Sequence, residues 1–347
     1  MPWQIFTGTG QPSRPTPRTP AWRAIPPPPP WRSGRAEPLP FRTTPPLNEA
    51  VNAALHLRRP LLLTGLPGSG KSSLVEVLAA ELELGEVLRW HVTSKSTLQD
   101  SLYQYDALGR LQDTQVEASR REAARREAAA AGSSSVTSSP LEPDSSVQKF
   151  VALGPLGTAL ASHDRPRALL IDEIDKSDLD LPGDLLNVLE RGEFDIPPLV
   201  RDAAAQASRT ARGADAADIE HVVRGADRQP YPVVGGIVQA RHFPVIVFTS
   251  NGERTFPPPF LRRCVQFDMP RPRAALLSDI VTAHLGASAA AAQREAIEEF
   301  AGRLAANSTL AIDQLLSLVY LTTGEAPPGS ATRRSLKALL LTELDSR

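Results

Sequence analysis

The chain has 347 residues, 41% of them hydrophobic, and its 38 Lys and Arg residues against 39 Asp and Glu residues leave a net charge of −1. This length is enough for two domains, and the near-neutral balance lacks the basic excess that is typical of nucleic-acid-binding domains. The single cysteine, Cys264, excludes an internal disulfide and a cysteine-rich metal site. Because the N-terminus has no apolar signal core and no run approaches about 20 apolar residues, we expect a cytoplasmic protein that does not cross a membrane.

Residues 1–46 are rich in proline, with an unbroken run over residues 26–30 that Trp22 and Trp31 flank. Such a segment favours polyproline II and cannot build a packed core alone, so we expect a disordered extension. The alternative is a docking arm whose tryptophans bind a partner or a neighbouring subunit. After it, apolar residues at helical spacing predict a helix over residues 47–57.

The next stretch joins an apolar strand, residues 61–63, to the pattern G-x-x-x-x-G-K-S and then to a helix. Glycines let the backbone bend tightly, so successive N–H groups can face one anion, and the positive end of the helix dipole lies at the same point. Lys71 can then reach the β- and γ-phosphates of a nucleotide, and the Ser72 hydroxyl can ligate Mg²⁺. A glycine-rich turn with a chance lysine is the alternative, but the flanking strand and helix favour a phosphate loop. The predicted nucleotide-binding residues are Gly65, Pro67, Gly68, Ser69, Gly70, Lys71, Ser72 and Ser73.

The following part of the chain predicts a second strand over residues 87–92 and then less regular sequence. His91, in that strand, has no partner at a useful spacing, and we interpret it as a structural histidine, not a metal ligand. Residues 113–147 look like an insertion, with an exposed Ala-, Glu- and Arg-rich helix over residues 116–131 followed by a flexible Ser-rich run. Residues 193–243 predict a hairpin-like excursion whose interior order is poorly specified.

A further apolar strand ends in two adjacent carboxylates, Asp172 and Glu173. Acidic residues often end strands, so this feature alone is weak. In a chain with a phosphate loop, however, the first carboxylate belongs next to the Mg²⁺ shell, and the second can polarise an attacking water. The sequence therefore predicts Ser72 and Asp172 as the metal-binding pair and Glu173 as the catalytic base.

The last apolar strand, residues 243–248, leads into a polar end at Asn251. An asparagine there can orient the hydrolytic water or contact the γ-phosphate, and its alternative is a turn former. Arg262 and Arg263 precede a short strand, where they are either surface charges or groups that reach into a neighbouring site. From residue 274 the pattern is helical, near residues 274–285, 290–306, 308–322 and 331–345.

The order of these elements resembles the AAA+ ATPases, and more closely their MoxR-like branch, over about residues 41–325. Four further stretches carry the resemblance, at residues 52–55, 102–107, 192–197 and 249–254. The resemblance implies an α/β fold, with a P-loop αβα core around a parallel five-stranded sheet and a small all-helical lid. The implied regions are a Pro-rich extension over 1–46, a core over 47–271 with insertions at about 113–147 and 193–243, and a lid over 272–347.

The resemblance also implies ATP and Mg²⁺ as ligands, bound between core and lid. No arginine stands at residues 308–313, where many relatives carry the lid residue called sensor 2, and Arg333 and Arg334 lie later in the chain. The implied roles are Walker A for Lys71 and Ser72, Walker B for Asp172 and Glu173, sensor 1 for Asn251, and arginine finger for Arg263 with Arg262 in reserve.

The implied function is that of an ATP-hydrolysing motor or chaperone-like switch. It would form a hexameric ring and remodel a protein client or a co-encoded effector, of von Willebrand A type or protease-like. One alternative is a slow ATP-dependent assembly switch that recruits its effector through the Pro-rich arm. A nucleic-acid-associated AAA+ motor is a second, and neither a basic stripe nor a zinc module supports it. A small-molecule kinase is less favoured still, since nothing resembles an acceptor pocket.

Overall fold

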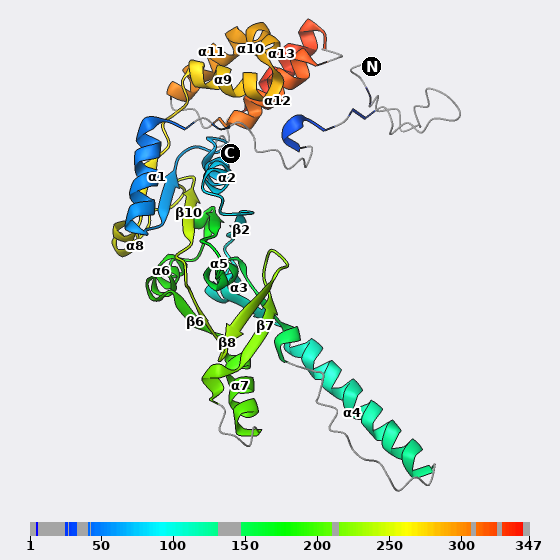
Figure 1. Cartoon of the computed structure of the whole chain (residues 1–347). Helices are drawn as coiled ribbons and strands as arrows, with labels where there is room; N and C mark the ends of the chain where they lie inside the picture. The colour runs from blue at the N-terminus through cyan, green and yellow to red at the C-terminus, as the bar shows by residue number, and fades with distance from the viewer. Residues whose placement is uncertain are drawn as a thin grey trace, which may run out of the picture.

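The computed structural model describes residues 5, 25–26, 28–32, 41, 43–130, 147–209, 215–306, 310–324 and 328–342. In Figure 1 the helical lid lies at one end, the αβα core in the middle and a second sheet at the other end. Most of the expected disordered extension and of the Ser-rich run lies outside the described residues. Among the described residues, no helix combines the length and the apolarity needed to cross a bilayer.

The core sheet is parallel and five-stranded, as predicted, and its strand order is β11-β1-β10-β5-β2. Parallel strands covered on both faces require nearly continuous apolar runs, and the three inner strands β1, β10 and β5 have them, whereas β2 and β11 at the edges alternate. The strands are β1 (Leu61–Thr64), β2 (Leu88–His91), β5 (Ala168–Asp172), β10 (Val245–Ser250) and β11 (Val265–Asp268).

Alternate side chains of the three inner strands, β1, β10 and β5, enter two different apolar clusters, which makes the core three-layered. Leu63 and Leu170 pack in the cluster that contains the buried residues of α1 and α2. Leu62 and Leu169 pack in the other cluster, with the buried residues of α5, α6 and α8. This period of two follows from strand geometry. The covering helices are α1 (Pro45–Leu57), α2 (Lys71–Glu81), α5 (Pro155–Ala161), α6 (Leu181–Arg191) and α8 (Pro258–Arg263).

Because the strands are parallel, their carboxyl ends meet at one edge of the sheet. Thr64 pairs in register with Ser250, and His91 pairs with Asp172. The phosphate loop, the two carboxylates and Asn251 follow these ends directly, so one edge gathers them. Val265, which opens β11, pairs instead with Leu61 at the amino-terminal edge.

A second sheet of six strands, which the sequence analysis did not predict, shares one apolar cluster with the core sheet. It is built from short segments, and part of it lies in the excursion at 193–243. That excursion contains the predicted hairpin, β7 with β8, but also an ordered helix, so its description as poorly specified is wrong. The strands, in order across the sheet, are β3 (Tyr103–Tyr105), β4 (Val151–Leu153), β7 (Glu220–Arg224), β8 (Pro230–Val234), β9 (Ile237–Gln239) and β6 (Glu193–Asp195).

Two helices extend from this second sheet at the end of the molecule away from the lid (Figure 1). One is α7 (Pro197–Arg209), and the other is α4 (Ala107–Ala130), which begins well before the expected start near residue 116. The side chain of Asp106 accepts a hydrogen bond from the Gly109 N–H at 2.7 Å, which accounts for the earlier start. Shorter turns flank these elements: α3 (Leu98–Leu102), η3 (Val147–Phe150), η4 (Ile174–Lys176) and η5 (Ala216–Asp218).

A buried cluster of Arg167, Asp227 and Tyr231 joins the two sheets. Arg167, directly before β5, donates to Asp227 Oδ2 at 2.7 Å and to the Tyr231 hydroxyl oxygen at 2.8 Å. Its other terminal nitrogen donates to the carbonyl of Glu86 at 3.1 Å. The Arg167 and Asp227 side chains are only 9% and 7% exposed. The cluster therefore fixes the β7–β8 turn against the start of a core strand.

The C-terminal region is helical, as predicted, and its helices share an apolar cluster that includes Leu277, Phe300 and Leu315. The expected helix over 290–306 is divided at Gln293, whose backbone leaves helical geometry. Leu66, from the phosphate loop, also packs against this cluster. The helices are α9 (Ala274–Leu285), α10 (Ala287–Ala292), α11 (Arg294–Ala305), α12 (Ile312–Thr323) and α13 (Ser330–Leu340).

Candidate nucleotide-binding site

The phosphate loop is held in a shape that only glycine allows at two of its positions. Gly68 has φ +75° and Gly70 has φ +84°, the left-handed region that side chains disfavour. Their surroundings are also closed, because a Cβ on Gly68 would lie 3.0 Å from the Ile312 nitrogen. A Cβ on Gly70 would lie 2.5 Å from the ring of Phe41. The loop is therefore a fixed cradle pressed between the lid and an aromatic ring.

Lys71 lies at the start of α2 and is almost fully buried. Its ammonium donates to the carbonyls of Gly65 and Leu66, at 2.7 and 3.0 Å, and to Asn251 Oδ1 at 2.9 Å. Burial lowers the pKa of Lys71, and the nearby carboxylates, Asp175 foremost, oppose that shift. All three hydrogen-bond acceptors are neutral, so the positive charge is not cancelled by direct contact with an anion.

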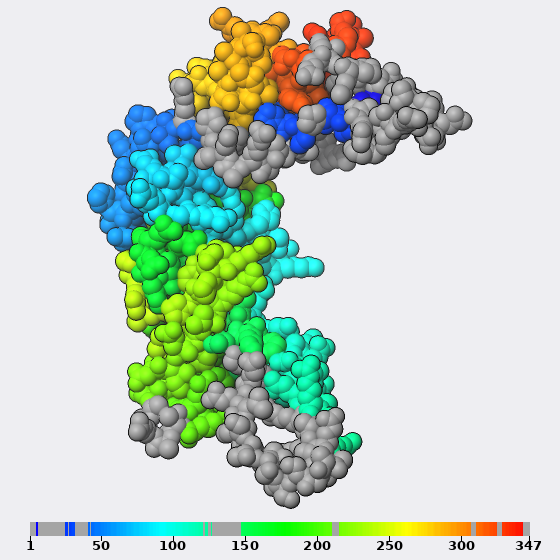
Figure 2. All heavy atoms as spheres, turned by 45° about the vertical axis from the view of Figure 1, so that its right-hand side comes forward, coloured from blue at the N-terminus to red at the C-terminus, as the bar shows by residue number. Residues whose placement is uncertain are grey.

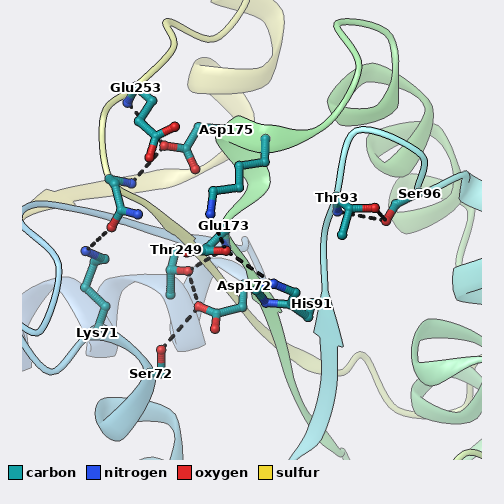
Figure 3. A network of polar contacts seen from close by, with 12 residues as sticks. Lys71, Ser72, His91, Thr93, Ser96, Asp172, Glu173, Asp175, Thr249 and Glu253 are labelled. Atoms are coloured by element: carbon teal, nitrogen blue, oxygen red, sulfur yellow. Dashed lines mark hydrogen bonds and ion pairs between the residues drawn. The ribbon is translucent and has the colours of Figure 1, made fainter. Parts of the chain in front are cut away.

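The Ser72 and Asp172 side chains approach each other at the end of β5 (Figure 3). Ser72 Oγ donates to Asp172 Oδ1 at 3.2 Å, and the Thr249 hydroxyl donates to the same carboxylate oxygen. A hydroxyl and a carboxylate beside a phosphate loop form the oxygen donor set that Mg²⁺ takes in nucleotide sites. The predicted metal pair thus fits the cation. Among the described residues, no group of three or more His, Cys, Asp or Glu side chains forms a metal cluster.

Glu173 occupies a constrained backbone position, and its carboxylate already has two side-chain partners. The residue has φ 59° and ψ 47°, in the left-handed region, and its N–H donates to Thr249 Oγ1 at 2.9 Å. Its Oε2 lies 2.8 Å from Lys176 Nζ and 3.3 Å from His91 Nε2. The hydrogen bond to Glu173 raises the pKa of Lys176. His91 is therefore not the isolated histidine that the sequence indicated, because the parallel register of β2 and β5 brings it to Glu173.

Asp175 is a site residue that the sequence analysis missed. Its side chain is buried, and its Oδ2 accepts from the backbone N–H groups of Asn251, at 2.9 Å, and Glu253, at 3.2 Å. These bonds fix the turn that carries Asn251, whose side chain meets Lys71. The available signal was the third carboxylate in the run after β5, but which N–H groups it reaches depends on the fold. Figure 3 shows this chain of contacts from Lys71 to Asp175.

Arg262 and Arg263 are not brought together with the other predicted site residues. They end α8, immediately before β11, at the amino-terminal edge of the sheet. Arg263 is half-exposed and forms an ion pair with Glu190 of α6. Since the loop follows the carboxyl end of β1, the two sites lie at opposite ends of the core strands.

A cavity of about 420 Å³ opens between the phosphate loop and the lid. That volume lies within the range of small-molecule sites, roughly 300–1,000 Å³. On the lid side, the cavity reaches Ile312 and Asp313 where sensor 2 was sought. Arg333 points elsewhere, donating to the Pro328 carbonyl at 2.8 Å. The residues that line the cavity include Trp31, Phe41, Gly68, Gly70, Leu276, Ile280, His284 and Ile312.

Comparison with known proteins agrees with this geometry at the level of the family. No curated protein sequence matches the chain. Two solved structures of RuvB variants from Thermotoga maritima align at 14% identity, with TM-scores of 0.38 and 0.36. They cover 84% of this chain, which spans 66% and 67% of theirs.

A family model covers the loop, the two carboxylates and Asn251. It is described as the AAA domain of the dynein-related subfamily, and it matches residues 60–263. This match takes in more than half of the chain, and nucleotide binding is a general property that it implies. The chain belongs to the AAA domain family, dynein-related subfamily.

Proposed function

We propose that this protein hydrolyses ATP to ADP and phosphate with the help of Mg²⁺. The observation that carries the proposal is the convergence of three contacts at one edge of the core sheet. These are Lys71 with Asn251, Ser72 with Asp172, and Thr249 with both Asp172 and the Glu173 backbone. A positive charge, an oxygen donor pair and a further carboxylate in one place are the requirements of phosphoryl transfer to water.

The phosphate loop and Lys71 would bind the triphosphate. Lys71 exchanges its neutral carbonyl acceptors for the β- and γ-phosphate oxygens, which are stronger, charged acceptors. Ser72 and Asp172 would hold Mg²⁺, which when bound neutralises charge on the phosphate oxygens. Burial of Lys71 strengthens its interaction with the phosphates, because water screens it less.

Glu173 would act as the general base. Its carboxylate accepts a proton from a water that attacks the γ-phosphorus, the bond to the bridging oxygen breaks, and ADP leaves with that electron pair. Asn251, held by Asp175, orients the water or the γ-phosphate. Glu173 first has to release Lys176 and His91, both of which now occupy the same carboxylate oxygen, Oε2.

We further propose a MoxR-like protein that assembles into a hexameric ring and remodels a protein client. The position of Arg263 at the opposite edge of the sheet from its own loop supports a role in the site of a neighbouring subunit. A ring built head to tail brings one subunit's edge to the next subunit's loop. The alternative with the same fold is a slow assembly switch, which would differ in steady-state rate and in its output, the recruitment of an effector.

The test compares two substitutions in the full chain, Glu173→Gln and Lys71→Ala, by ATPase assay and binding of a fluorescent ATP analogue. Glu173→Gln is expected to bind normally and to lose turnover by about 10²–10⁴-fold. Lys71→Ala is expected to lose about 1.5–3 kcal/mol of binding, or roughly 10–150-fold in affinity. Asp172→Asn should weaken binding only when Mg²⁺ is present.

Matched controls are Glu298→Gln, on an exposed face of the lid, and Lys95→Ala, on an exposed turn. Both should behave as wild type in each assay. Wild-type turnover by Glu173→Gln would remove it as the base, and unchanged binding by Lys71→Ala would remove the loop as the site.

A further inference from the structure

Trp31 packs against two helices of the lid of its own chain. Its ring meets the ring of His284, on α9, edge-on at 6.1 Å and 82°, and the ring of Tyr320, on α12, at 5.7 Å and 77°. Edge-to-face geometry at these distances is favourable for aromatic pairs. Trp31 also packs against the apolar cluster of the lid. Trp31 is therefore held between two lid helices, α9 and α12.

Phe41, later in the N-terminal region, packs against the core. Its ring lies over Gly70 so closely that a Cβ there would be 2.5 Å away, and it packs against the cluster beneath α1 and α2. Trp31 and Phe41 both line the cavity between loop and lid. In Figure 2 the blue atoms that precede the core lie directly against the orange and red lid. Two N-terminal aromatic rings thus contribute to the walls of the cavity, Trp31 on the lid side and Phe41 on the core side.

His284 adds a polar edge to this wall. It lines the cavity, and its Nδ1 is buried without a hydrogen-bond partner among the described residues. Burial lowers the pKa of His284, so the ring is neutral at neutral pH. Trp31 covers this ring. Removing Trp31 would thus open the cavity wall and hydrate His284 at the same time.

The proline run restricts the backbone directly before Trp31. Pro28, Pro29 and Pro30 immediately precede Trp31. Proline fixes φ near −65° and removes conformations from the unbound segment, so less entropy is lost when Trp31 is held in place. This accounts for a proline run beside a tryptophan without requiring a partner protein.

We propose that Trp31 is a positioning residue that holds one wall of the cavity in place and thereby sets how long a nucleotide stays bound. This rests on the proposed function, since it takes the cavity as the site of the nucleoside part of ATP. A wall preorganised before binding costs less to order, and the gain is expressed mainly as slower dissociation. By thermodynamic linkage, a bound nucleotide in turn stabilises the contacts that Trp31 makes with the lid.

The experiment measures dissociation of ADP labelled on the ribose with a fluorophore that accepts energy from tryptophan. The full chain is mixed rapidly with excess unlabelled ADP, and wild type is compared with Trp31→Ala and Trp31→Phe. Loss of two aromatic contacts should speed dissociation by about tenfold in Trp31→Ala. Trp31→Phe, which keeps an aromatic ring between the two lid helices, should dissociate close to the wild-type rate but lose the share of energy transfer that Trp31 contributes beside Trp90 of β2.

Leu339→Ala is the matched control, because Leu339 is a lid side chain that is 72% exposed and does not line the cavity. It should leave both readouts unchanged. If Trp31→Ala does not fold, Tyr320→Leu removes one of the two ring contacts from the lid side and should give a smaller acceleration. A general loss of stability would not reduce energy transfer in Trp31→Phe while its dissociation rate stays normal.

Two results would overturn the proposal while leaving the proposed function intact. One is a dissociation rate in Trp31→Ala, or in Tyr320→Leu where that variant replaces it, equal to that of wild type. The other is undiminished energy transfer in Trp31→Phe. Failure of wild type to bind labelled ADP or ATP at all would instead overturn the nucleotide site itself, and the role of Trp31 with it.

Discussion

The two sheets of this protein share an apolar cluster but are covered differently. Core strands such as β10 are buried on both faces, whereas β7 and β8 alternate between buried and exposed positions. Val222, Val234 and Ile237 face outward from the second sheet at 44–48% exposure. A doubly covered sheet fixes the groups at its edge, which suits chemistry. A sheet with one open face keeps a surface free for contacts with other molecules.

The contrast between the two sheets predicts that ATP hydrolysis depends on residues of the core alone. The largest expected loss of turnover is at Arg263. We expect Arg263→Ala to lower ATP turnover by about 10³–10⁵-fold, the range for arginines that stabilise transferring phosphoryl groups in trans. Mixing Arg263→Ala with Glu173→Gln should restore activity at interfaces that combine an intact Glu173 with an intact Arg263. Co-assembly of the two variants is established first by size-exclusion chromatography with differently tagged chains. If the co-assembled mixture stays as inactive as its parts, Arg263 does not act in trans, and Arg262 is tested next.

The next largest effect should be on the free energy of unfolding, and it should come from the cluster of Arg167, Asp227 and Tyr231 that joins the two sheets. Removing the Asp227 carboxylate leaves Arg167 buried and unpaired, so Asp227→Ala should cost about 3–5 kcal/mol of unfolding free energy. Urea denaturation measures it, with the exposed Asp218→Asn as control. A cost below 1 kcal/mol would mean that water replaces the carboxylate.

That contribution should depend on pH in a defined direction. Burial alone would raise the pKa of Asp227, but hydrogen bonds from Tyr231, Arg167 and the Gln229 N–H outweigh it and lower the pKa. Stability from a lowered carboxyl pKa is fully present above the unfolded value, about 3.9, and is lost as pH falls through the folded value. The difference in unfolding free energy between wild type and Asp227→Ala should therefore become smaller below about pH 4.

Smaller effects should show whether the two sheets unfold together. Leu169→Ala, in the core sheet, should cost about 2–5 kcal/mol. Val233→Ala, in the second sheet, should cost roughly 1.5 kcal/mol. The two side chains are 0% and 1% exposed. Because both lie in the cluster that spans the two sheets, each change should shift a single transition, and hydrogen exchange of second-sheet amides should accelerate in Leu169→Ala. Unchanged exchange there would separate the sheets into two units.

The smallest effect should come from α4, which extends from the second sheet. Leu111 is 56% exposed, so Leu111→Gln should change stability by less than about 0.5 kcal/mol. Thermal unfolding at low and high protein concentration measures this. A larger loss, or one that depends on concentration, would indicate that α4 packs against a second copy of the chain.

The core could be predicted from the sequence because its chemistry follows its strands directly. Asp172, Glu173 and Asn251 stand at strand ends, and parallel strands bring such ends together without further information. His91 could not be assigned in this way, since its contact with Glu173 depends on which strand lies next to β5. The pairing of Arg263 with Glu190 likewise depends on helix packing that no local pattern encodes.

The second sheet could not be predicted for a different reason. Strands of three residues, such as β3, β4 and β6, are too short to show a period of two, and their partners lie far apart in the chain. The prediction of a disordered extension is wrong at Trp31, and most of the remaining proline-rich segment lies outside the described residues. Composition indicates that it cannot fold alone, but it does not exclude that Trp31 is held by a lid formed much later in the chain.

Leu66 has a mechanical consequence. It belongs to the phosphate loop by sequence, yet its side chain packs in the apolar cluster of the lid. The Lys71 ammonium donates to the carbonyl of the same residue. A phosphate that drew the ammonium away from this carbonyl would remove a contact from a residue whose side chain touches the lid. Leu66 is therefore a direct mechanical connection between the phosphate loop and the lid.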